Sequence, residues 1–367
     1  MKPITIAQYF SDYRNGLLID VRSPGEYEAA HVAGALSLPL FTNDERKIVG
    51  ITYKQQSREQ AIKLGLDFWG SKMRPTVEQV EKWQQEFLEK NPGLAGRPPV
   101  VVHCWRGGLR SSAVAWLLDL YGFNAFTIVG GYKSFRKWCI KTLEGPWPFK
   151  VLGGHTGSGK SAVLGQLIKK GEPVLDLEAM ASHKGSAFGN INMPQQPGQE
   201  MFENNLALRL HALRQQMQES GKNFIWVEDE SQRIGDINMP FDFYKQLRQA
   251  PLLVLDIPFE ERLQYLIKDY GRGDLEKLVN ATIRIQKRLG GLEAKKVVDY
   301  LMDHDLENAF AILLRYYDKW YDKAMDRHRP EDFMEKVSFL KLEKVDEKRN
   351  ARAVLQAAQT APGEASG

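Results

Sequence analysis

Short apolar runs alternate with helical patterns over residues 1–140, which predicts an α/β domain. Three of the runs are apolar at consecutive positions, as in strands that are buried on both faces of a parallel sheet. These runs are GLLIDV at 16–21, PPVVVH at 98–103 and AFTIVGG at 125–131. Helical spacing in SSAVAWLLDLYG predicts a helix that ends at Gly122, and a more polar, helix-rich insertion occupies about 45–95.

A second α/β pattern starts near residue 150 with a strand, a glycine-rich loop and an apolar helix, in that order, in KVLGGHTGSGKSAVLGQLIKKG. Further strands are predicted for PVLDL, NFIWVED and PLLVLDI, and the pattern beyond them is helical and rich in aromatic and charged residues. We therefore predict two α/β domains with a helical C-terminal portion. The predicted segments are a domain at 1–140, a linker at 141–150, a domain at 151–260, helices at 261–355 and a flexible tail at 356–367.

Composition narrows the class of protein. The 367 residues are 43% hydrophobic and 26% charged, which suffices for two or three ordinary cores. The sequence has neither an N-terminal signal pattern nor a run of about 18 apolar residues, so we expect a cytoplasmic protein without a membrane partner. A net charge of +4 does not by itself indicate a nucleic-acid partner. Of the two cysteines, Cys139 is predicted to be a core residue, with a role as a resolving thiol left open.

The segment VVVHCWRGGLRSS places the other cysteine, Cys104, between a predicted strand and the start of a predicted helix. A tight loop at a helix N-terminus directs backbone N–H groups at an anion, and the helix dipole with Arg110 lowers a thiol pKa. We predict that Cys104 is a catalytic thiolate and that Arg106 and Arg110 hold an anionic substrate. The string HCxxGxxRS fits both a cysteine phosphatase and a rhodanese-type loop of seven residues, so the attacked atom stays open between phosphorus, sulfur and selenium.

The segment LLIDVRSPGEYEAAHVAGALSLPL, at 17–40, resembles the N-terminal signature of rhodanese-like domains. The matching positions, in order, are Asp20, Arg22, Glu26, Tyr27, His31, Gly34 and Ala35. Within this signature we interpret Arg22 and His31 as residues that shape the fold. The loop after the cysteine is longer than in most rhodanese sulfurtransferases, which favours a larger anion, either phosphate or a selenium carrier.

The segment GGHTGSGKS has the spacing of a phosphate-binding loop, and it lies between a predicted strand and an apolar helix as that loop requires. Backbone N–H groups of such a loop surround a diphosphate, and its lysine neutralises the outer oxygens. The predicted diphosphate-binding residues are Gly154, Thr156, Gly157, Ser158, Gly159, Lys160 and Ser161, and Ser161 is also a candidate ligand for Mg²⁺. The motif indicates a diphosphate but not a nucleotide.

An acidic partner for this loop is expected at the end of a neighbouring strand. NFIWVEDES supplies Glu228, Asp229 and Glu230, whereas VLDLEAM supplies Asp176 and Glu178. The spacing does not decide among them.

The order of DVRSPGEY, HCWRGGLRS and GGHTGSGKS, followed by DLEAMASHKGSAFG and WVEDESQRIG, resembles the bacterial tRNA 2-selenouridine synthase family up to about residue 340. The resemblance implies a rhodanese-like domain, a phosphate-loop domain and a two-step reaction on tRNA that carries 2-thiouridine at the wobble position. Geranyl diphosphate would first alkylate the sulfur, and selenophosphate would then replace the S-geranyl group. The resemblance implies that these compounds are substrates and that no cofactor is tightly bound; we expect Cys104 to act only in the selenium step.

Contacts with RNA are the least determined part of the sequence. In LLRYYDKWYDKAMDRHR, aromatic residues interleave with charges, which fits an amphipathic helix with an aromatic core face or a surface on which bases stack. Candidate phosphate contacts are Lys133, Arg136, Lys287, Arg288, Lys319 and Arg327. Three alternatives to the two-step enzyme remain: a rhodanese-type cysteine phosphatase, an ATP-dependent sulfurtransferase and a non-catalytic RNA-binding scaffold.

Overall fold

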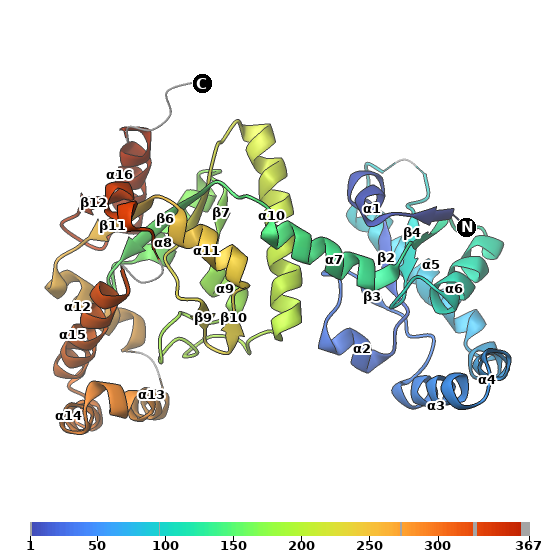
Figure 1. The fold of residues 1–367 in the computed structure, drawn as a ribbon, viewed down its shortest axis with the longest axis horizontal. Helices are drawn as coiled ribbons and strands as arrows, with labels where there is room; N and C mark the ends of the chain where they lie inside the picture. Colours follow the sequence, from blue (N-terminus) through green and yellow to red (C-terminus); the bar gives the residue numbers. More distant parts are fainter. Residues whose placement is uncertain (1, 95, 272–273, 326–328, 361–367) are drawn as a thin grey trace. The chain divides into compact units, whose positions relative to one another are not determined.

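The computed structural model describes residues 2–94, 96–271, 274–325 and 329–360. The chain divides into two compact units: Met1–Lys141 with Glu203–Asn205, and Thr142–Phe202 with Leu206–Gly367. Each unit contains a five-stranded sheet with helices packed around it (Figure 1). The predicted α/β fold class is therefore confirmed.

The sheet of the first unit is entirely parallel and has the strand order β1-β5-β4-β2-β3. Its strands are β1 (Lys2–Ile4), β2 (Leu17–Asp20), β3 (Leu36–Ser37), β4 (Val100–His103) and β5 (Ala125–Ile128). The three predicted apolar runs form β2, β4 and β5, and every residue in these strands is buried. Because the strands are parallel, the loops that follow β2 and β4 emerge at the same edge of the sheet, and Asp20 is in register with His103.

Helices of the first unit follow the strands, and three of them form the predicted insertion. These three are α3 (Asn43–Gln55), α4 (Arg58–Gly70) and α5 (Met73–Lys90). The others are α1 (Ile6–Asp12), α2 (Pro24–Ala29), α6 (Leu109–Tyr121) and α7 (Gly131–Glu144). The helix after the cysteine loop, α6, ends where the sequence predicts, at Gly122, whose φ of 106° suits a glycine cap.

The sheet of the second unit is also parallel, with the order β12-β11-β6-β8-β7. Its strands are β6 (Phe149–Gly154), β7 (Val174–Leu175), β8 (Ile225–Glu228), β11 (Leu252–Asp256) and β12 (Val337–Lys341). A short antiparallel ladder joins β9 (Arg233–Ile234) to β10 (Ile237–Asn238). The strand β12 corrects the prediction of helices alone over 261–355, because this half-exposed segment pairs with the open edge of β11.

Two sets of helices in the second unit pack in different places. Helices α12 to α15 share a core of their own, whereas the last helix, α16, packs on α8 beside the sheet. Their bounds are α8 (Lys160–Lys169), α9 (Leu177–Ala181), α10 (Gln199–Ser220), α11 (Phe241–Gln249), α12 (Phe259–Tyr270), α13 (Leu275–Leu289), α14 (Gly291–Met302), α15 (Leu306–Met325), the 3-10 helix η1 (Glu331–Lys336) and α16 (Glu347–Thr360).

Two predicted boundaries differ from the structure. The linker predicted at 141–150 shrinks to 145–148, because α7 continues to Glu144 and β6 starts at Phe149. The flexible tail predicted from 356 is helical as far as Thr360, since Ala357 and Ala358 pack against the apolar cluster between α8 and the sheet. Residues 361–367 of that tail lie outside the described residues. Within the described part of the chain, every helix is too short or too polar to span a membrane.

Candidate functional site

The cysteine loop of the first unit connects β4 to α6. Cys104 follows the last residue of β4, and its carbonyl oxygen accepts a hydrogen bond from the N–H of Tyr132 at 2.8 Å. Gly107 has a φ of 65°, and a Cβ there would lie 2.5 Å from the carbonyl oxygen of Ile128. The loop is therefore held against the turn between β5 and α7, and only glycine fits at this close approach.

The surroundings of Cys104 favour its thiolate form. Its Sγ atom lies 3.3 Å from the Oγ of Ser111. Burial raises the pKa of the thiol, but the side chain and N–H of Ser111, the charge of Arg110 and the N–H of Gly108 outweigh it, so the pKa lies below its usual value. The direction of this pKa agrees with the thiolate that the sequence predicts, and the catalytic role of Cys104 stays a prediction.

The two arginines of the loop have different surroundings. Arg110 donates to Glu26, with an Nη1–Oε2 distance of 2.7 Å. Burial raises the pKa of Glu26, but Arg110, the N–H of Ser23 and Arg46 bring it down to about 2. Arg106 is exposed, and it lines the same cavity as Cys104. Arg106 is thus the arginine available to an incoming anion, whereas Arg110 already has an acidic partner.

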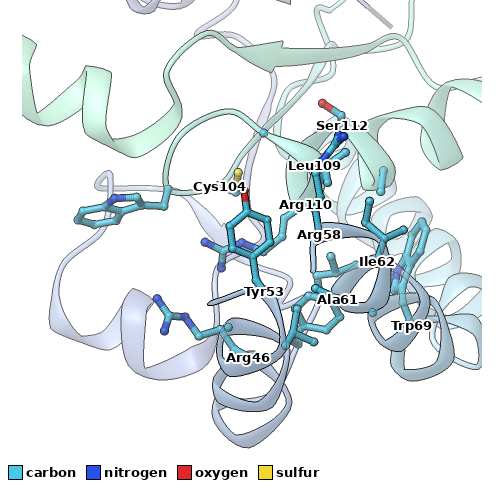
Figure 2. A pocket seen from close by; sticks show the side chains of 18 of the residues that line it. Arg46, Tyr53, Arg58, Ala61, Ile62, Trp69, Cys104, Leu109, Arg110 and Ser112 are labelled. Atoms are coloured by element: carbon cyan, nitrogen blue, oxygen red, sulfur yellow. The ribbon is translucent and has the colours of Figure 1, made fainter. Parts of the chain in front are cut away.

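A cavity of about 940 Å³ opens beside Cys104. Side chains from α3 and α4 face the cysteine loop across it, as Figure 2 shows. The sequence predicts the helices of the insertion but not this cavity. The one sequence signal that points to an apolar wall here is the spacing of Ile62, Leu66 and Trp69, which places three large apolar side chains along α4.

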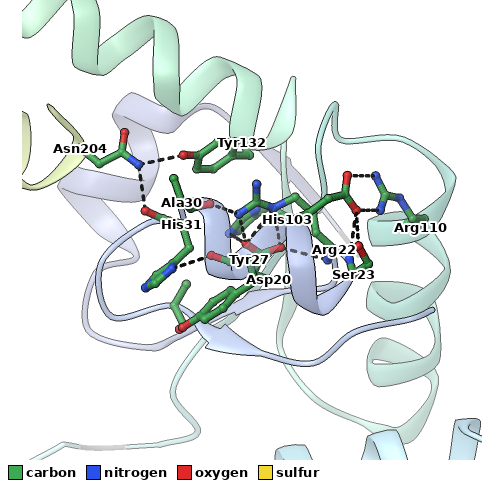
Figure 3. Close-up of polar contacts among 12 residues, drawn as sticks. Asp20, Arg22, Ser23, Tyr27, Ala30, His31, His103, Arg110, Tyr132 and Asn204 are labelled. Carbon is green, nitrogen blue, oxygen red and sulfur yellow. Dashed lines mark hydrogen bonds and ion pairs between the residues drawn. The ribbon is translucent and has the colours of Figure 1, made fainter. Parts of the chain in front are cut away.

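A buried polar network supports the strand edge next to the loop (Figure 3). Arg22 donates to Asp20 and to the carbonyl oxygen of Ala30 at 2.6 and 2.7 Å, and its guanidinium lies 3.9 Å from the ring centroid of Tyr132. The His31 ring lies parallel to that of Tyr27, 3.9 Å between centroids. Both contacts agree with the interpretation that Arg22 and His31 shape the fold.

The phosphate loop of the second unit connects β6 to α8. Gly157 and Gly159 have φ values of 81° and 75°, which a glycine adopts without strain. Lys160 donates to the carbonyl oxygen of Gly154 at 2.7 Å, so its ammonium group lies folded over the loop. Arg262 of α12 donates to the carbonyl oxygen of Thr156 at 3.0 Å and holds the loop from outside. Ser158, another of the predicted binding residues, is buried.

Among the candidate acids, the structure places Glu178 next to the loop. Ser161 donates to Glu178 at 2.7 Å, and the N–H of Glu178 donates to Glu228 at 2.7 Å. Asp176 caps α9 by accepting from the N–H of Ala179. Burial raises the pKa of Glu228 well above its usual value, and the charges of Asp176 and Glu178 add to the effect. Glu228 therefore helps to position Glu178 through the hydrogen bond that it accepts from the N–H of Glu178.

The two remaining acids have separate roles. Asp229 is paired with Arg248 at 3.0 Å and with Arg329 at 2.6 Å. Glu230 lines the cavity of the phosphate loop. Burial raises the pKa of Glu230 well above its usual value, the charge of Glu178 adds to the rise and Lys160 opposes it. A protonated Glu230 would be a hydrogen-bond donor in this cavity.

The phosphate loop forms one end of a cavity of about 590 Å³ that has aromatic walls. The aromatic side chains come from α12 and α15, and they are Tyr265, Tyr270, Tyr316, Tyr317, Trp320 and Tyr321. Tyr321 accepts from the N–H of Gly154 at 2.9 Å and donates to Asp229 at 3.2 Å. The C-terminal half of α15 therefore brings Tyr321 to the phosphate loop, while Phe310 and Leu314 in its N-terminal half pack into the helical core.

The remaining predicted residues include exposed and buried side chains. Lys133, Lys287, Arg288 and Lys319 are exposed, and Arg288 lines the cavity of the phosphate loop. Arg136 forms an ion pair with Glu203 at 2.5 Å, and Arg327 lies outside the described residues. Cys139 is fully buried, as expected of a core residue.

Comparison with known proteins assigns both halves of the chain to families. Residues 7–137 match the rhodanese-like domain, and residues 147–349 match the model described as the tRNA 2-selenouridine synthase AAA domain. A protein named tRNA 2-selenouridine synthase from Nitrosomonas europaea is 37% identical over 257 residues, which cover 69% of this chain and 63% of the relative.

Two further relatives with the same name align over almost their whole length. The protein from Hydrogenovibrio crunogenus is 36% identical, covering 86% of this chain and 90% of the relative. The protein from Bdellovibrio bacteriovorus is 34% identical, covering 89% of this chain and 93% of the relative. The chain belongs to the tRNA 2-selenouridine synthase family.

Proposed function

We propose that this protein converts 2-thiouridine of tRNA into 2-selenouridine in two steps, with geranyl diphosphate and then selenophosphate as substrates. The observation that supports this proposal is a cavity with the phosphate loop at one end and aromatic side chains along its walls. An isoprenoid diphosphate brings, beside its phosphates, a hydrocarbon chain that is transferred from water to an apolar surface on binding. The tyrosines and tryptophan of α12 and α15 supply that apolar surface at the required place.

In the first step, the sulfur of 2-thiouridine attacks the allylic carbon of geranyl diphosphate. The carbon–oxygen bond breaks, pyrophosphate leaves with the bonding pair, and the base loses its N3 proton when the carbon–sulfur bond has formed. Negative charge grows on the departing pyrophosphate, so groups already aimed at that charge accelerate the step. Lys160 and the N–H groups of the loop are such groups, and the ammonium of Lys160 leaves Gly154 to bind the outer oxygens.

The residues next to Lys160 also suit Mg²⁺. The Ser161 hydroxyl and the Glu178 carboxylate offer hard oxygen ligands within 2.7 Å of each other, and a diphosphate would complete the shell with water. Among the described residues, His, Cys, Asp and Glu form no group of three or more that could hold a metal ion. When bound, Mg²⁺ would neutralise charge on the leaving pyrophosphate.

In the second step, selenium replaces the alkylated sulfur at C2 of the base. The carbon–sulfur bond breaks and geranylthiol leaves, a carbon–selenium bond forms, and water breaks the phosphorus–selenium bond to release phosphate. No atom changes its net oxidation state, so the step needs no external oxidant or reductant. We assign this step to the Cys104 thiolate, with exposed Arg106 binding the phosphate group of the selenium donor.

The geometry argues against a cysteine phosphatase. That reaction requires an acid that protonates the leaving alcohol. Glu26 is a carboxyl group beside the cysteine loop, and its pKa of about 2 and its ion pair with Arg110 keep it ionised at neutral pH. It therefore has no proton to give.

Mass spectrometry of nucleosides tests both steps. A 2-thiouridine-containing tRNA is incubated with the protein and geranyl diphosphate without ATP, and selenophosphate is added afterwards. We expect a geranyl mass shift and then the exchange of S-geranyl for selenium. Lys160→Ala should stop the first shift, whereas Cys104→Ala should stop only the second.

The outcome that overturns the proposal is also specific. If product appears only when ATP is supplied, the phosphate loop binds a nucleotide and the ATP-dependent sulfurtransferase is the better description. If Cys104→Ala loses geranyl transfer as well, the assignment of the cysteine to the second step is wrong. Normal conversion by both Cys104→Ala and Lys160→Ala would indicate that neither loop carries the chemistry.

A further inference from the structure

The cavity beside Cys104 is larger and more apolar than a small inorganic donor requires. At about 940 Å³ it is at the upper end of the roughly 300–1,000 Å³ found for small-molecule sites. Selenophosphate is a compact anion that needs cationic and N–H partners rather than hydrocarbon walls. The cavity therefore indicates that a second, apolar group reaches the thiol.

The walls of this cavity carry large apolar side chains that are exposed to water. Tyr53, Leu66 and Trp116 are 59%, 57% and 52% exposed, and all three line the cavity. They come from α3, α4 and α6, so the surface is contiguous across three helices. A contiguous exposed apolar surface of this kind marks a binding site more often than isolated apolar residues do.

Cationic side chains accompany this apolar surface. Arg46, Lys54 and Arg58 line the cavity together with Arg106 of the cysteine loop. Arg46 lies 3.6 Å from Glu26 but remains half exposed, and Lys54 and Arg58 are exposed. A ligand that suits this site combines a hydrocarbon chain with negative charge, which describes an alkylated nucleotide within RNA.

We propose that the cavity binds the geranyl chain of S-geranyl-2-thiouridine, so that the carbon–sulfur bond to be broken lies at Cys104. This inference rests on the proposed function, because the alkylated base is its intermediate. A chain of ten carbons, each about the size of a water molecule with its roughly 30 Å³ share of liquid, needs roughly 300 Å³ and fits the cavity. After the bond breaks, the geranylthiolate that leaves takes a proton from solvent, and the walls of the cavity hold geranylthiol until it dissociates.

A glycine on the wall provides the test. A Cβ added at Gly50, in α3, would meet no atom within 4 Å, and the residue lines the cavity, so Gly50→Phe fills the space without a clash at its first atom. Gly70, at the end of α4, has the same open surroundings but does not line the cavity, which makes Gly70→Phe a matched control. Leu66→Asp, at a 57% exposed position, is a second variant that changes polarity instead of volume.

The assay follows selenation of two synthetic RNA stem-loops by the full chain, one with S-geranyl-2-thiouridine and one with S-methyl-2-thiouridine. We expect Gly50→Phe and Leu66→Asp to lower the ratio of kcat/KM for S-geranyl over S-methyl at least tenfold, since even single methylene groups in a pocket change this ratio by tenfold or more. Gly70→Phe should keep the ratio of the unchanged protein. An equal loss for both stem-loops, or no loss for either, would overturn the proposed pocket.

A direct binding measurement tests the proposed pocket independently of the selenation reaction. Isothermal titration of the full chain with the nucleoside S-geranyl-2-thiouridine should give binding that weakens at least tenfold in Gly50→Phe. Failure of the unchanged protein to bind this nucleoside would refute the pocket even where selenation is seen. Binding that weakens in Gly50→Phe, in a protein that does not selenate the S-geranyl stem-loop, would support the pocket and refute the proposed function.

Discussion

Replacing Asp318 with alanine should loosen the contact between α15 and the phosphate loop. Asp318 accepts two hydrogen bonds from Arg262, both 2.8 Å long, and Arg262 also binds the carbonyl oxygen of Thr156 at 3.0 Å. The side chains are 6% exposed for Arg262 and 19% for Asp318. The pair is therefore a largely buried, two-point ion pair that holds the loop and the helix together.

Removing one partner of a buried ion pair costs about 3–5 kcal/mol, because the other charge stays buried without compensation. Arg262 keeps carbonyl oxygens of Thr156 and Ile257 as partners, and Asp318 is not fully buried, so we expect a loss of about 2–3 kcal/mol. At roughly 2–4 °C per kcal/mol for domains of this size, Tm should fall by roughly 4–12 °C.

Differential scanning calorimetry measures the change in Tm, and the KM for geranyl diphosphate reports on the loop. That KM should rise about tenfold, because Arg262 without its Asp318 partner holds the carbonyl of Thr156 less rigidly. Glu307→Ala is the control, since Glu307 lies on the same helix, is exposed and does not line the cavity of the phosphate loop. If Asp318→Ala has the Tm and KM of Glu307→Ala, the ion pair does not position the loop and the reasoning is wrong.

Three further changes test single contacts. Ser111→Ala removes a hydrogen bond that lowers the pKa of Cys104, so alkylation of the thiol by iodoacetamide, followed by peptide mass spectrometry, should begin at higher pH than in the unchanged protein. Glu178→Gln should slow geranyl transfer roughly 10–100-fold and raise the Mg²⁺ concentration for half-maximal rate; an unchanged Mg²⁺ profile would contradict its role. Tyr321→Phe leaves the N–H of Gly154 without its partner and should cost about 1–3 kcal/mol, seen as a lower Tm, whereas an unchanged Tm would show that water replaces the hydroxyl.

Local patterns were sufficient to predict seven of the ten strands in the two parallel sheets, together with both loops. The apolar run before Cys104 is continuous, because β4 is buried throughout, whereas Lys150 interrupts the run before Gly154; each loop starts where its run ends. The aromatic segment at 313–329 is helical up to Met325, and part of its aromatic set faces a cavity rather than the core. Periodicity identified the amphipathic helix, but it did not indicate what the tyrosines in its C-terminal half contact.

Features that depend on packing between distant segments were not predictable in this way. The choice of Glu178 among the candidate acids follows from α9, which places that carboxylate over Ser161 while Asp176 caps the helix. The strand β12 carries only a weak signal, because it is five residues long, half exposed and paired along one side. The cavity beside Cys104 requires α3 and α4 to pack opposite α6, and no local pattern in any one of these helices specifies that arrangement.

The two cavities share a physical design that fits the proposed chemistry. Each combines a glycine-containing loop at the end of a parallel strand with aromatic or aliphatic side chains from helices outside the βα unit: α12 and α15 in one case, α3 and α4 in the other. A transferase for a compact anion needs only the loop. An isoprenoid group that is first attached to sulfur and later removed with it must be desolvated twice, once as a diphosphate and once as a thioether. A chain that performs both steps therefore needs an apolar wall at each loop, and each unit of this protein has one.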